Sequence, residues 1–305
     1  MDGSLYVSMR FAVYDVFTDT PYAGNPLAVV FDADALSDAL MQAIAREFNL
    51  SETVFIRSAV KTRRAAAIRI FTPTKELPFA GHPTIGAAIA LAESEYGRSE
   101  AKDMVFVLDA SIGPVRCGVK IAPDGATFAE FAAPRLAQQV ARDPSLASVA
   151  RAIGLTPEDM GFNAHRPSVF SVGVSFVMIP VVNADALARA KPCDDLRSLE
   201  LGATEIFVYT RAEREAPYSF RARMFAPEIG IAEDPATGGA AAAFAGVLAR
   251  FEDLPEGWHT LPILQGVEMG RPSLIGLDVH IENGALAGAR IAGKAVKVSE
   301  GVLYL

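Results

Sequence analysis

Three ionisable residues of this chain have sequence surroundings that suit proton transfer. Glu52 stands at the start of an apolar and hydroxylic stretch, whereas His82 and Asp234 each directly precede a proline. A glutamate at a strand end is commonly solvated. One that faces a cleft is desolvated, which raises its pKa toward the range where a carboxyl both takes up and releases a proton. These residues are therefore candidates for acid/base chemistry on a small molecule.

His82 and Asp234 are both expected at the N-cap of a buried helix or one residue before it. A carboxylate there is a common helix cap, so Asp234 has a structural explanation as well as a functional one. Histidine is a poor cap, and the positive end of a buried helix lowers the pKa of an imidazole. We therefore expect His82 to contact a ligand.

Two further polar residues lie in turns rich in glycine and proline. Asn25, within Gly24-Asn25-Pro26, could cap its loop or reach a ligand. Arg271, which follows Gly270, could pair with a substrate carboxylate or hold its loop together. Both alternatives stay open from the sequence.

The elements that must position these residues occur twice. A segment that begins at Arg69, crosses a loop and enters an Ala/Gly-rich helix is echoed, 154 residues later, by one that begins at Arg223. Superposed on the proline of each copy, His82 falls against Asp234, and the second loop is two residues shorter. We infer two homologous halves, each aiming the free N–H groups of a helix N-terminus at a ligand. A cleft between the halves is the expected place for chemistry.

Apolar periodicity predicts which segments are strands and which are helices. In the first half, strands are expected at 11–17, 27–31, 51–56, 65–71, 104–108, 113–121 and 126–131, with helices from 37 to 48 and at 84–96. A polar stretch at 134–144 indicates a boundary. The second half has expected helices at 146–153, 184–190 and from Thr237, strands at 169–181, 205–210 and 218–225, and several short strands from 261 to 305. The stretches 85–91 and 240–248 are apolar on nearly every face, which is typical of enclosed helices and predicts an α+β architecture of two sheet-enclosed domains.

Composition excludes several classes of partner. The chain has 305 residues, 51% of them apolar, and a net charge of −8, which suits two globular domains and offers no basic stripe for nucleic acid. The longest wholly apolar stretch, 240–249, is too short to span a membrane. The opening residues Met1 to Ser4 carry no cationic segment before an apolar core, so we predict no secretory signal and a cytoplasmic protein.

Several familiar chemistries lack their motifs. The chain has no GxGxxG after a strand, no GxxxxGK[ST], no HExxH and no GxSxG. Cys117 and Cys193 stand apart, with no spacing typical of zinc or disulfide frameworks. Nucleotide-binding, zinc-protease and serine-hydrolase functions therefore lack support from the residues.

In combination, these motifs resemble the PhzF-like (phenazine biosynthesis) proteins of the diaminopimelate epimerase-like superfamily. The matching segments follow the family's order over nearly the whole chain: Ala23-Gly24-Asn25-Pro26, Asn49-Leu50-Ser51-Glu52-Thr53, Phe71-Thr72-Pro73, Ala80-Gly81-His82-Pro83-Thr84, Glu233-Asp234-Pro235-Ala236-Thr237-Gly238, and Gln265-Gly266 with Gly270-Arg271-Pro272. The resemblance implies two similar domains, each a mostly antiparallel, barrel-like β-sheet wrapped around a central apolar helix, and commonly a homodimer. We expect domains at 1–130 and 131–291, with strands near 292–305 packing back on the first.

The resemblance also implies roles for individual residues. The family's acid/base is the glutamate of a Ser-Glu-Thr motif, which matches Glu52. The adjoining serine, the histidine of Gly-His-Pro and the aspartate before Pro-Ala-Thr-Gly line the family's substrate site, and they match Ser51, His82 and Asp234. The phenazine enzyme of the family that this chain resembles is an isomerase, which moves a proton on a dihydro-hydroxyanthranilate without metal or organic cofactor.

The predicted site combines these matches with backbone N–H groups at 84–86 and 237–239, which are expected to hold a substrate carboxylate. The predicted catalytic residues are Glu52, His82 and Asp234, and the predicted substrate-binding residues are Asn25, Ser51, Gly81, Thr84, Thr237, Gly238, Gly239 and Arg271.

Two departures from the family pattern bear on the activity. Family members often carry a serine where this chain has Gly239, so only the N–H of that residue remains for substrate. Racemases and epimerases of the superfamily use one cysteine at each helix N-terminus, and no cysteine lies near either loop here. A two-thiol racemase is therefore disfavoured.

Three hypotheses follow. The leading one is a cofactor-independent isomerase in which Glu52 moves a proton on a small carboxylate-bearing substrate, oriented and polarised by His82 and Asp234. The second is an amino-acid epimerase or racemase that uses two of these residues as bases. The third is a small-molecule binding protein that has lost turnover.

Overall fold

The computed structural model describes residues 8–58, 64–193 and 201–305, so the opening residues on which the secretory prediction rests lie outside it. The chain divides into two compact units. Unit 1 combines the chain up to Phe131 with Ala292–Leu305, and unit 2 is Ala132–Ile291. A carboxyl-terminal segment therefore completes the amino-terminal unit.

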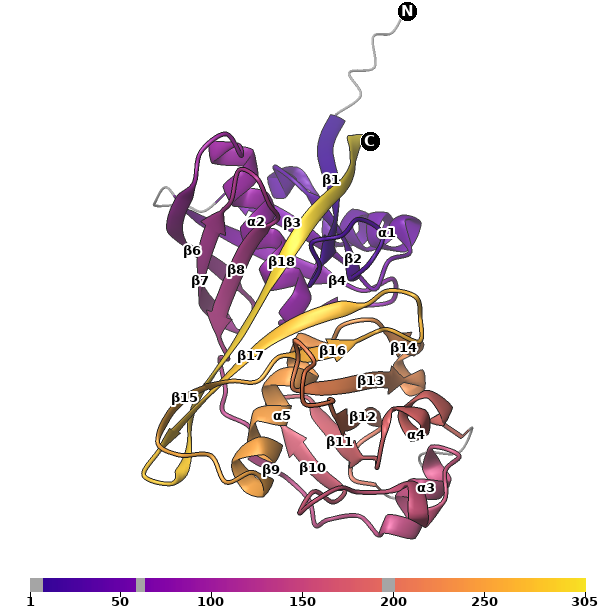
Figure 1. The fold of residues 1–305 in the computed structure, drawn as a ribbon. Helices are drawn as coiled ribbons and strands as arrows, with labels where there is room; N and C mark the ends of the chain where they lie inside the picture. Colours follow the sequence, from indigo (N-terminus) through magenta and orange to yellow (C-terminus); the bar gives the residue numbers. More distant parts are fainter. Residues whose placement is uncertain (1–7, 59–63, 194–200) are drawn as a thin grey trace, which may run out of the picture. The chain divides into compact units, whose positions relative to one another are not determined.

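Eight of the described strands form a closed ring that belongs mainly to unit 1 (Figure 1). Around the ring they are β18 (Ala285–Tyr304), β1 (Ser8–Val16), β2 (Asn25–Val30), β3 (Glu52–Ser58), β4 (Ala65–Phe71), β6 (Lys102–Ala110), β7 (Gly113–Ile121) and β8 (Thr127–Ala132), which pairs again with β18. The pairs β2–β3 and β4–β6 are parallel. The short β5 (Glu76–Leu77) adds to β4.

The ring encloses one apolar helix. Helix α2 (Gly81–Tyr96) packs on β1, β2, β3, β6 and β7, and most of its side chains are buried. Gly86 permits the close approach to β2, because a Cβ at this position would lie 2.4 Å from Leu27 Cδ2. Helix α1 (Asp38–Phe48) begins at the Ser37 cap and buries Met41 and Ile44 against Phe55 and Phe71, after the short helix η1 (Ala33–Ala35).

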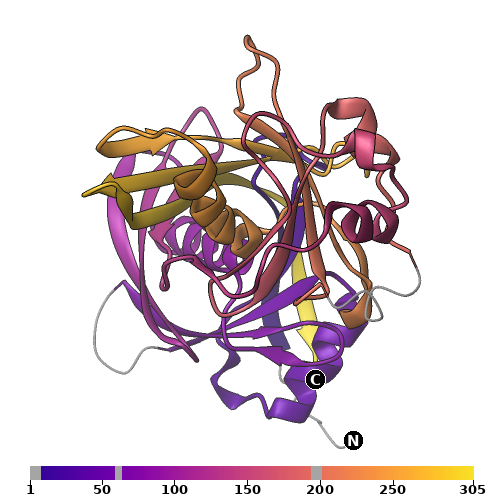
Figure 2. The same ribbon diagram turned by 90° about the horizontal axis from the view of Figure 1, so that it is seen from below.

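Unit 2 has its own strands and a second apolar helix, α5 (Gly238–Phe251), which packs on β9, β10, β11 and β17 (Figure 2). The strands are β9 (Gln138–Gln139), β10 (Ser168–Ser171), β11 (Ser175–Pro180), β12 (Glu205–Arg211), β13 (Phe220–Ala226), β14 (Ile231–Asp234), β15 (Gly257–Thr260), β16 (Ile263–Gln265) and β17 (Ser273–Glu282). The remaining described helices are α3 (Leu146–Ala152), η2 (Pro157–Asp159), α4 (Ala184–Arg189) and η4 (Pro227–Ile229).

The two units repeat one order of strand pairing. In unit 1, β1–β2–β3–β4–β6–β7 pair as antiparallel, parallel, antiparallel, parallel, antiparallel. In unit 2, β10–β11–β12–β13–β16–β17 pair in the same order. The sequence repeat is thus a repeat of topology, and the predicted α+β class with a sheet around a central helix is confirmed.

Several element predictions need correction. The expected strand at 169–181 is a hairpin of β10 and β11, because Gly173 adopts a φ of 114° and turns the chain. The expected short strands after 261 include β17 of 10 residues and β18 of 20 residues. Strand β18 is long because it continues from unit 2 into the ring of unit 1. In the part of the chain that the structure describes, no helix combines the length and apolarity needed to cross a membrane.

Candidate functional site

The parallel pair β2–β3 brings two predicted site residues to one edge of the unit 1 sheet. Asn25 is the first residue of β2 and Glu52 the first of β3, with Leu27 opposite Glu52 in the register. Strands that run in the same direction start at the same edge, so both side chains lie where the sheet begins. Helix α1 leads into this start, because its C-cap Asn49 takes the left-handed conformation and turns the chain toward β3.

His82 lies between these two residues. Asn25 Nδ2 is 3.3 Å from His82 Nδ1, and His82 Nε2 is 3.3 Å from Glu52 Oε2. All three are buried: Asn25 is 0% exposed, His82 4% and Glu52 8%. The contact between His82 Nε2 and Glu52 is close but lacks the alignment of a hydrogen bond. The three residues form one polar chain, which we call the Asn25–His82–Glu52 chain.

Within the Asn25–His82–Glu52 chain, burial determines the charge state of His82. Desolvation lowers the pKa of His82 to about 3, so the imidazole is neutral near pH 7. The Asn25 amide N–H₂ donates to Nδ1, which places the ring proton on Nε2, facing the Glu52 carboxylate. A neutral imidazole with that tautomer turns its N–H toward the carboxylate.

Three other predicted site residues of unit 1 lie near the Asn25–His82–Glu52 chain in the sequence. Ser51 is half-buried directly before β3, and Gly81 is the buried first residue of α2. Both the N–H and the Oγ1 of Thr84 donate to the Ala80 carbonyl, at 3.3 and 2.7 Å. The expectation that the Thr84 N–H holds a carboxylate is therefore wrong, because α2 begins three residues earlier than predicted and already uses it.

In unit 2, the predicted residues Asp234 and Thr237 contact each other. Thr237 Oγ1 lies 2.5 Å from Asp234 Oδ2, and Asp234 is 7% exposed. Thr237 is the N-cap of α5, so Gly238 and Gly239 are its first two residues. Their N–H groups have no partner within the helix and are available in helix geometry for an anion.

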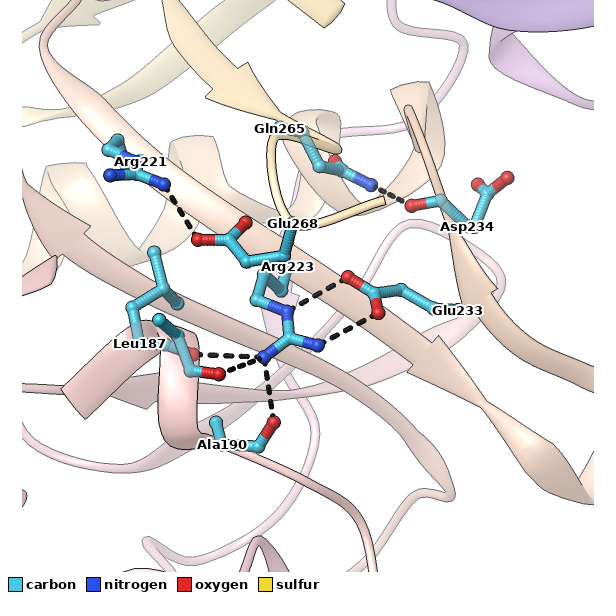
Figure 3. Close-up of polar contacts among 9 residues, drawn as sticks. Leu187, Ala190, Arg221, Arg223, Glu233, Asp234, Gln265 and Glu268 are labelled. Atoms are coloured by element: carbon cyan, nitrogen blue, oxygen red, sulfur yellow. Dashed lines mark hydrogen bonds and ion pairs between the residues drawn. The ribbon is translucent and has the colours of Figure 1, made fainter. Parts of the chain in front are cut away.

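Gln265 joins this group although it was not predicted as a site residue. It is fully buried, and its Nε2 donates to the Asp234 carbonyl at 2.7 Å (Figure 3). Its Nε2 also donates to Thr237 Oγ1 at 3.2 Å, while its Oε1 accepts from the Thr237 N–H at 3.2 Å. The sequence did contain a signal for this residue. Gln265 follows the apolar pair Ile263-Leu264, and Gln265-Gly266 is one of the segments that carry the family resemblance. Its partners depend on tertiary pairing.

A buried ion pair holds the strand that carries Asp234. Arg223 on β13 pairs with Glu233 on β14 through two contacts of 2.9 and 2.8 Å, and its Nη1 also donates to carbonyls at the end of α4, those of Leu187, Ala188 and Ala190 (Figure 3). Nearby, Arg221 pairs with Glu268 at 2.6 Å. These pairs fix both β14 and the turn after Gln265.

The predicted superposition of the two copies is also wrong in register. His82 is the second residue of α2, within its first turn, whereas Asp234 ends β14, three residues before the Thr237 cap of α5. By helix start, His82 corresponds to Gly239. A proline is tolerated both in the first turn of a helix and before it, so aligned prolines do not fix aligned helices.

Arg271 lies in the turn between β16 and β17. Its N–H donates to the Gly266 carbonyl at 3.0 Å. Gly266 has a φ of 77°, and a Cβ there would meet the Arg271 and Pro235 carbonyl oxygens at 2.5 and 2.6 Å. The turn therefore packs tightly beside the loop of Asp234. Among the described residues, no three His, Cys, Asp or Glu side chains gather as a metal site requires.

The family model for phenazine biosynthesis-like proteins matches residues 14–301. The chain belongs to this PhzF family. It is an enzyme of the isomerase class, as its curated relatives are.

The relatives match over nearly the full chain. An uncharacterized isomerase of Mesorhizobium japonicum is 46% identical, with 97% of this chain and 99% of the relative covered. The trans-2,3-dihydro-3-hydroxyanthranilate isomerase of Pseudomonas aeruginosa is 35% identical, with the same coverage of 97% and 99%. The crystal structure of a PhzF-family protein of Bacillus anthracis superposes with a TM-score of 0.86 at 27% identity, covering 98% of this chain and 100% of that one.

Proposed function

We propose that this PhzF-family chain is a cofactor-independent isomerase that moves a proton on a small carboxylate-bearing substrate, with Glu52 as both general base and general acid. The observation that carries the proposal is a buried carboxylate 3.3 Å from an imidazole that burial keeps neutral. Such a carboxylate has an uncharged imidazole beside it.

The proposed step conserves atoms and electrons. Glu52 takes a proton from a carbon next to an unsaturated or carboxylated group, and the electron pair of the broken C–H bond enters that system. The double bond shifts, and protonated Glu52 returns its proton to a different carbon. General acid/base catalysis of this kind contributes about 10²–10⁴-fold to rate.

Unit 2 carries a polar group of its own that suits binding. The N–H groups of Gly238 and Gly239 suit a substrate carboxylate, and the Asp234 carboxylate suits a hydroxyl or amino group. A relative that is 35% identical is named for trans-2,3-dihydro-3-hydroxyanthranilate, which carries all of these groups. We propose it as the first substrate to test, and a homodimer as the acting form, which sedimentation would test.

The test is turnover of that compound in ²H₂O, followed by NMR. We expect deuterium at the carbon that receives the proton, and loss of this signal in Glu52→Gln. Glu47→Gln, on the exposed face of α1, is the matched control and should keep full turnover. Full turnover by Glu52→Gln would overturn the acid/base role, and deuterium at an α-carbon with loss of chirality would favour an epimerase.

A further inference from the structure

Asp234 and Thr237 are both hydrogen-bonded to one residue that has no exposed surface, Gln265. Gln265 is 0% exposed, and its side chain makes three hydrogen bonds to these two residues. A buried side-chain amide costs free energy unless its hydrogen bonds are made. The hydrogen bonds of Gln265 therefore indicate which groups it positions.

The orientation of the Gln265 amide is determined by two backbone groups. Nε2 lies 2.7 Å from the Asp234 carbonyl, which can only accept, and Oε1 lies 3.2 Å from the Thr237 N–H, which can only donate. The reversed amide would set oxygen against oxygen and N–H against N–H. Nε2 is therefore the atom that also faces Thr237 Oγ1, at 3.2 Å.

This orientation settles the direction of the Thr237 hydroxyl. Oγ1 accepts a hydrogen bond from Gln265 Nε2, so its single proton is left for its other neighbour, Asp234 Oδ2, at 2.5 Å. A hydroxyl that donates to a carboxylate stabilises the ionised form and fixes its rotamer. The proton order runs from the amide to the hydroxyl to the carboxylate.

Strand pairing holds Gln265 in this place. It pairs with Ala222 of β13 and with Ser273 of β17, while Asp234 pairs with Met224, two residues along the same β13. Gly266 then turns the chain directly against Pro235. The backbone of Gln265 is thus held by strand pairing on both sides, which fixes the point from which its side-chain amide extends.

We infer that Gln265 is a positioning residue of this site, which acts through Thr237 to aim the Asp234 carboxylate at a hydrogen-bond donor on the substrate. The inference rests on the proposed function for the role of Asp234, and it adds a residue that makes no substrate contact. It predicts that Gln265 and Thr237 act as one unit.

The experiment is a double-mutant cycle of Gln265→Leu, Thr237→Val and their combination, with kcat and KM measured on trans-2,3-dihydro-3-hydroxyanthranilate. We expect each single variant to lower kcat/KM by about ten-fold or more, and the double variant to lose little beyond the worse single one. Thr237→Ser keeps the hydroxyl and should restore turnover to within about three-fold of the wild type. Independent, multiplicative losses, or no rescue by serine, would overturn the inference.

A second readout separates this inference from the proposed function. The urea midpoints of the same four proteins measure the coupling without any turnover, and the double variant should shift by less than the sum of the single shifts. If the wild type does not turn over the compound, the proposed substrate fails while the coupling still tests the hydrogen-bond order. Additive midpoints would overturn the inference whatever the activity.

Discussion

The two units build the loop before their central helix on the same frame but give it different chemistry. Arg69 on β4 pairs with Glu76 on β5 through contacts of 2.7 and 2.6 Å, as Arg223 on β13 pairs with Glu233 on β14. In both units the arginine also contacts a neighbouring helix: Asp38 of α1 in unit 1, and the carbonyl end of α4 in unit 2. The arginine–glutamate pair is therefore a structural feature that both units share, and the units differ in the polar residues near the start of each central helix.

A fully buried carboxamide orients the polar group in each unit. Asn25 donates to His82 and so directs the Nε2 proton toward Glu52, whereas Gln265 donates to Thr237 and so directs its hydroxyl toward Asp234. The first arrangement presents a carboxylate beside a neutral imidazole, which suits proton transfer. The second presents a hydrogen-bonded carboxylate near the N-terminus of α5, which suits binding.

The largest expected effect tests whether the two units differ in proton transfer. Glu205 is the first residue of β12, as Glu52 is of β3, and it lies on the same face as Phe207 and Tyr209, which pack on Phe244 of α5. We expect Glu52→Gln to lower kcat by about 10²–10⁴-fold and Glu205→Gln by less than about three-fold. Steady-state kinetics of both variants would measure these losses of kcat. Equal losses would contradict the proposal that proton transfer belongs to unit 1 alone.

The second effect tests the shared arginine frame. Arg223→Met leaves Glu233 and three helix-end carbonyls without their donor in a site where the arginine side chain is only 10% exposed, so we expect a loss of about 3–5 kcal/mol. Arg69→Met removes contacts to Glu76 and to the exposed Asp38, and should cost about 1–2 kcal/mol. Hydrogen exchange read separately in each unit measures both losses. A larger loss for Arg69→Met would reverse the ranking.

The third effect is the pH dependence that His82 adds to unit 1. Its folded pKa of about 3 lies below the unfolded value of 6.5, so the unfolded chain binds the proton first as the pH falls. The stability of the folded protein should therefore decrease below about pH 6.5, by up to about 1.4 kcal/mol per pH unit. Urea midpoints between pH 7 and pH 4.5 should fall less steeply in His82→Gln than in the wild type or in the half-exposed control His259→Gln. Parallel profiles would show that His82 titrates normally.

The smallest expected effect compares one glycine in each of the two enclosed helices, Gly86 of α2 and Gly239 of α5. A Cβ at Gly86 would lie 2.4 Å from Leu27 Cδ2, whereas the nearest atom to a Cβ at Gly239 is Phe176 Cζ at 3.7 Å. We expect Gly86→Ala to destabilise the protein by about 1–3 kcal/mol through overpacking. Gly239→Ala should change stability by less than about 1 kcal/mol, because alanine favours the helix and meets only ordinary contact. Thermal unfolding of both variants measures the difference, and a severe loss for Gly239→Ala would mean that its surroundings are tighter than described.

The sequence predicted the frame of the fold well and the register of the site less well. Strand 65–71 and strand 113–121 follow alternating apolar patterns, which are local properties, and the structure confirms both ranges. The alignment of His82 with Asp234 failed because a proline occupies the first turn of α2 but precedes the N-cap of α5. Local residue types are compatible with either position, and only packing against each unit's own sheet selects one.

By itself, the sequence determined the repeated halves, the two enclosed apolar helices and most of the polar residues of the candidate site, because residue type and periodicity are carried along the chain. The tertiary structure decided which nitrogen of His82 carries the proton, which helix N–H groups are already bonded, and that Gln265 holds Asp234 and Thr237. Each of these depends on hydrogen-bond distances between residues that are remote in sequence. Such distances follow from strand pairing, as when β13 brings Gln265 on β16 and Asp234 on β14 together.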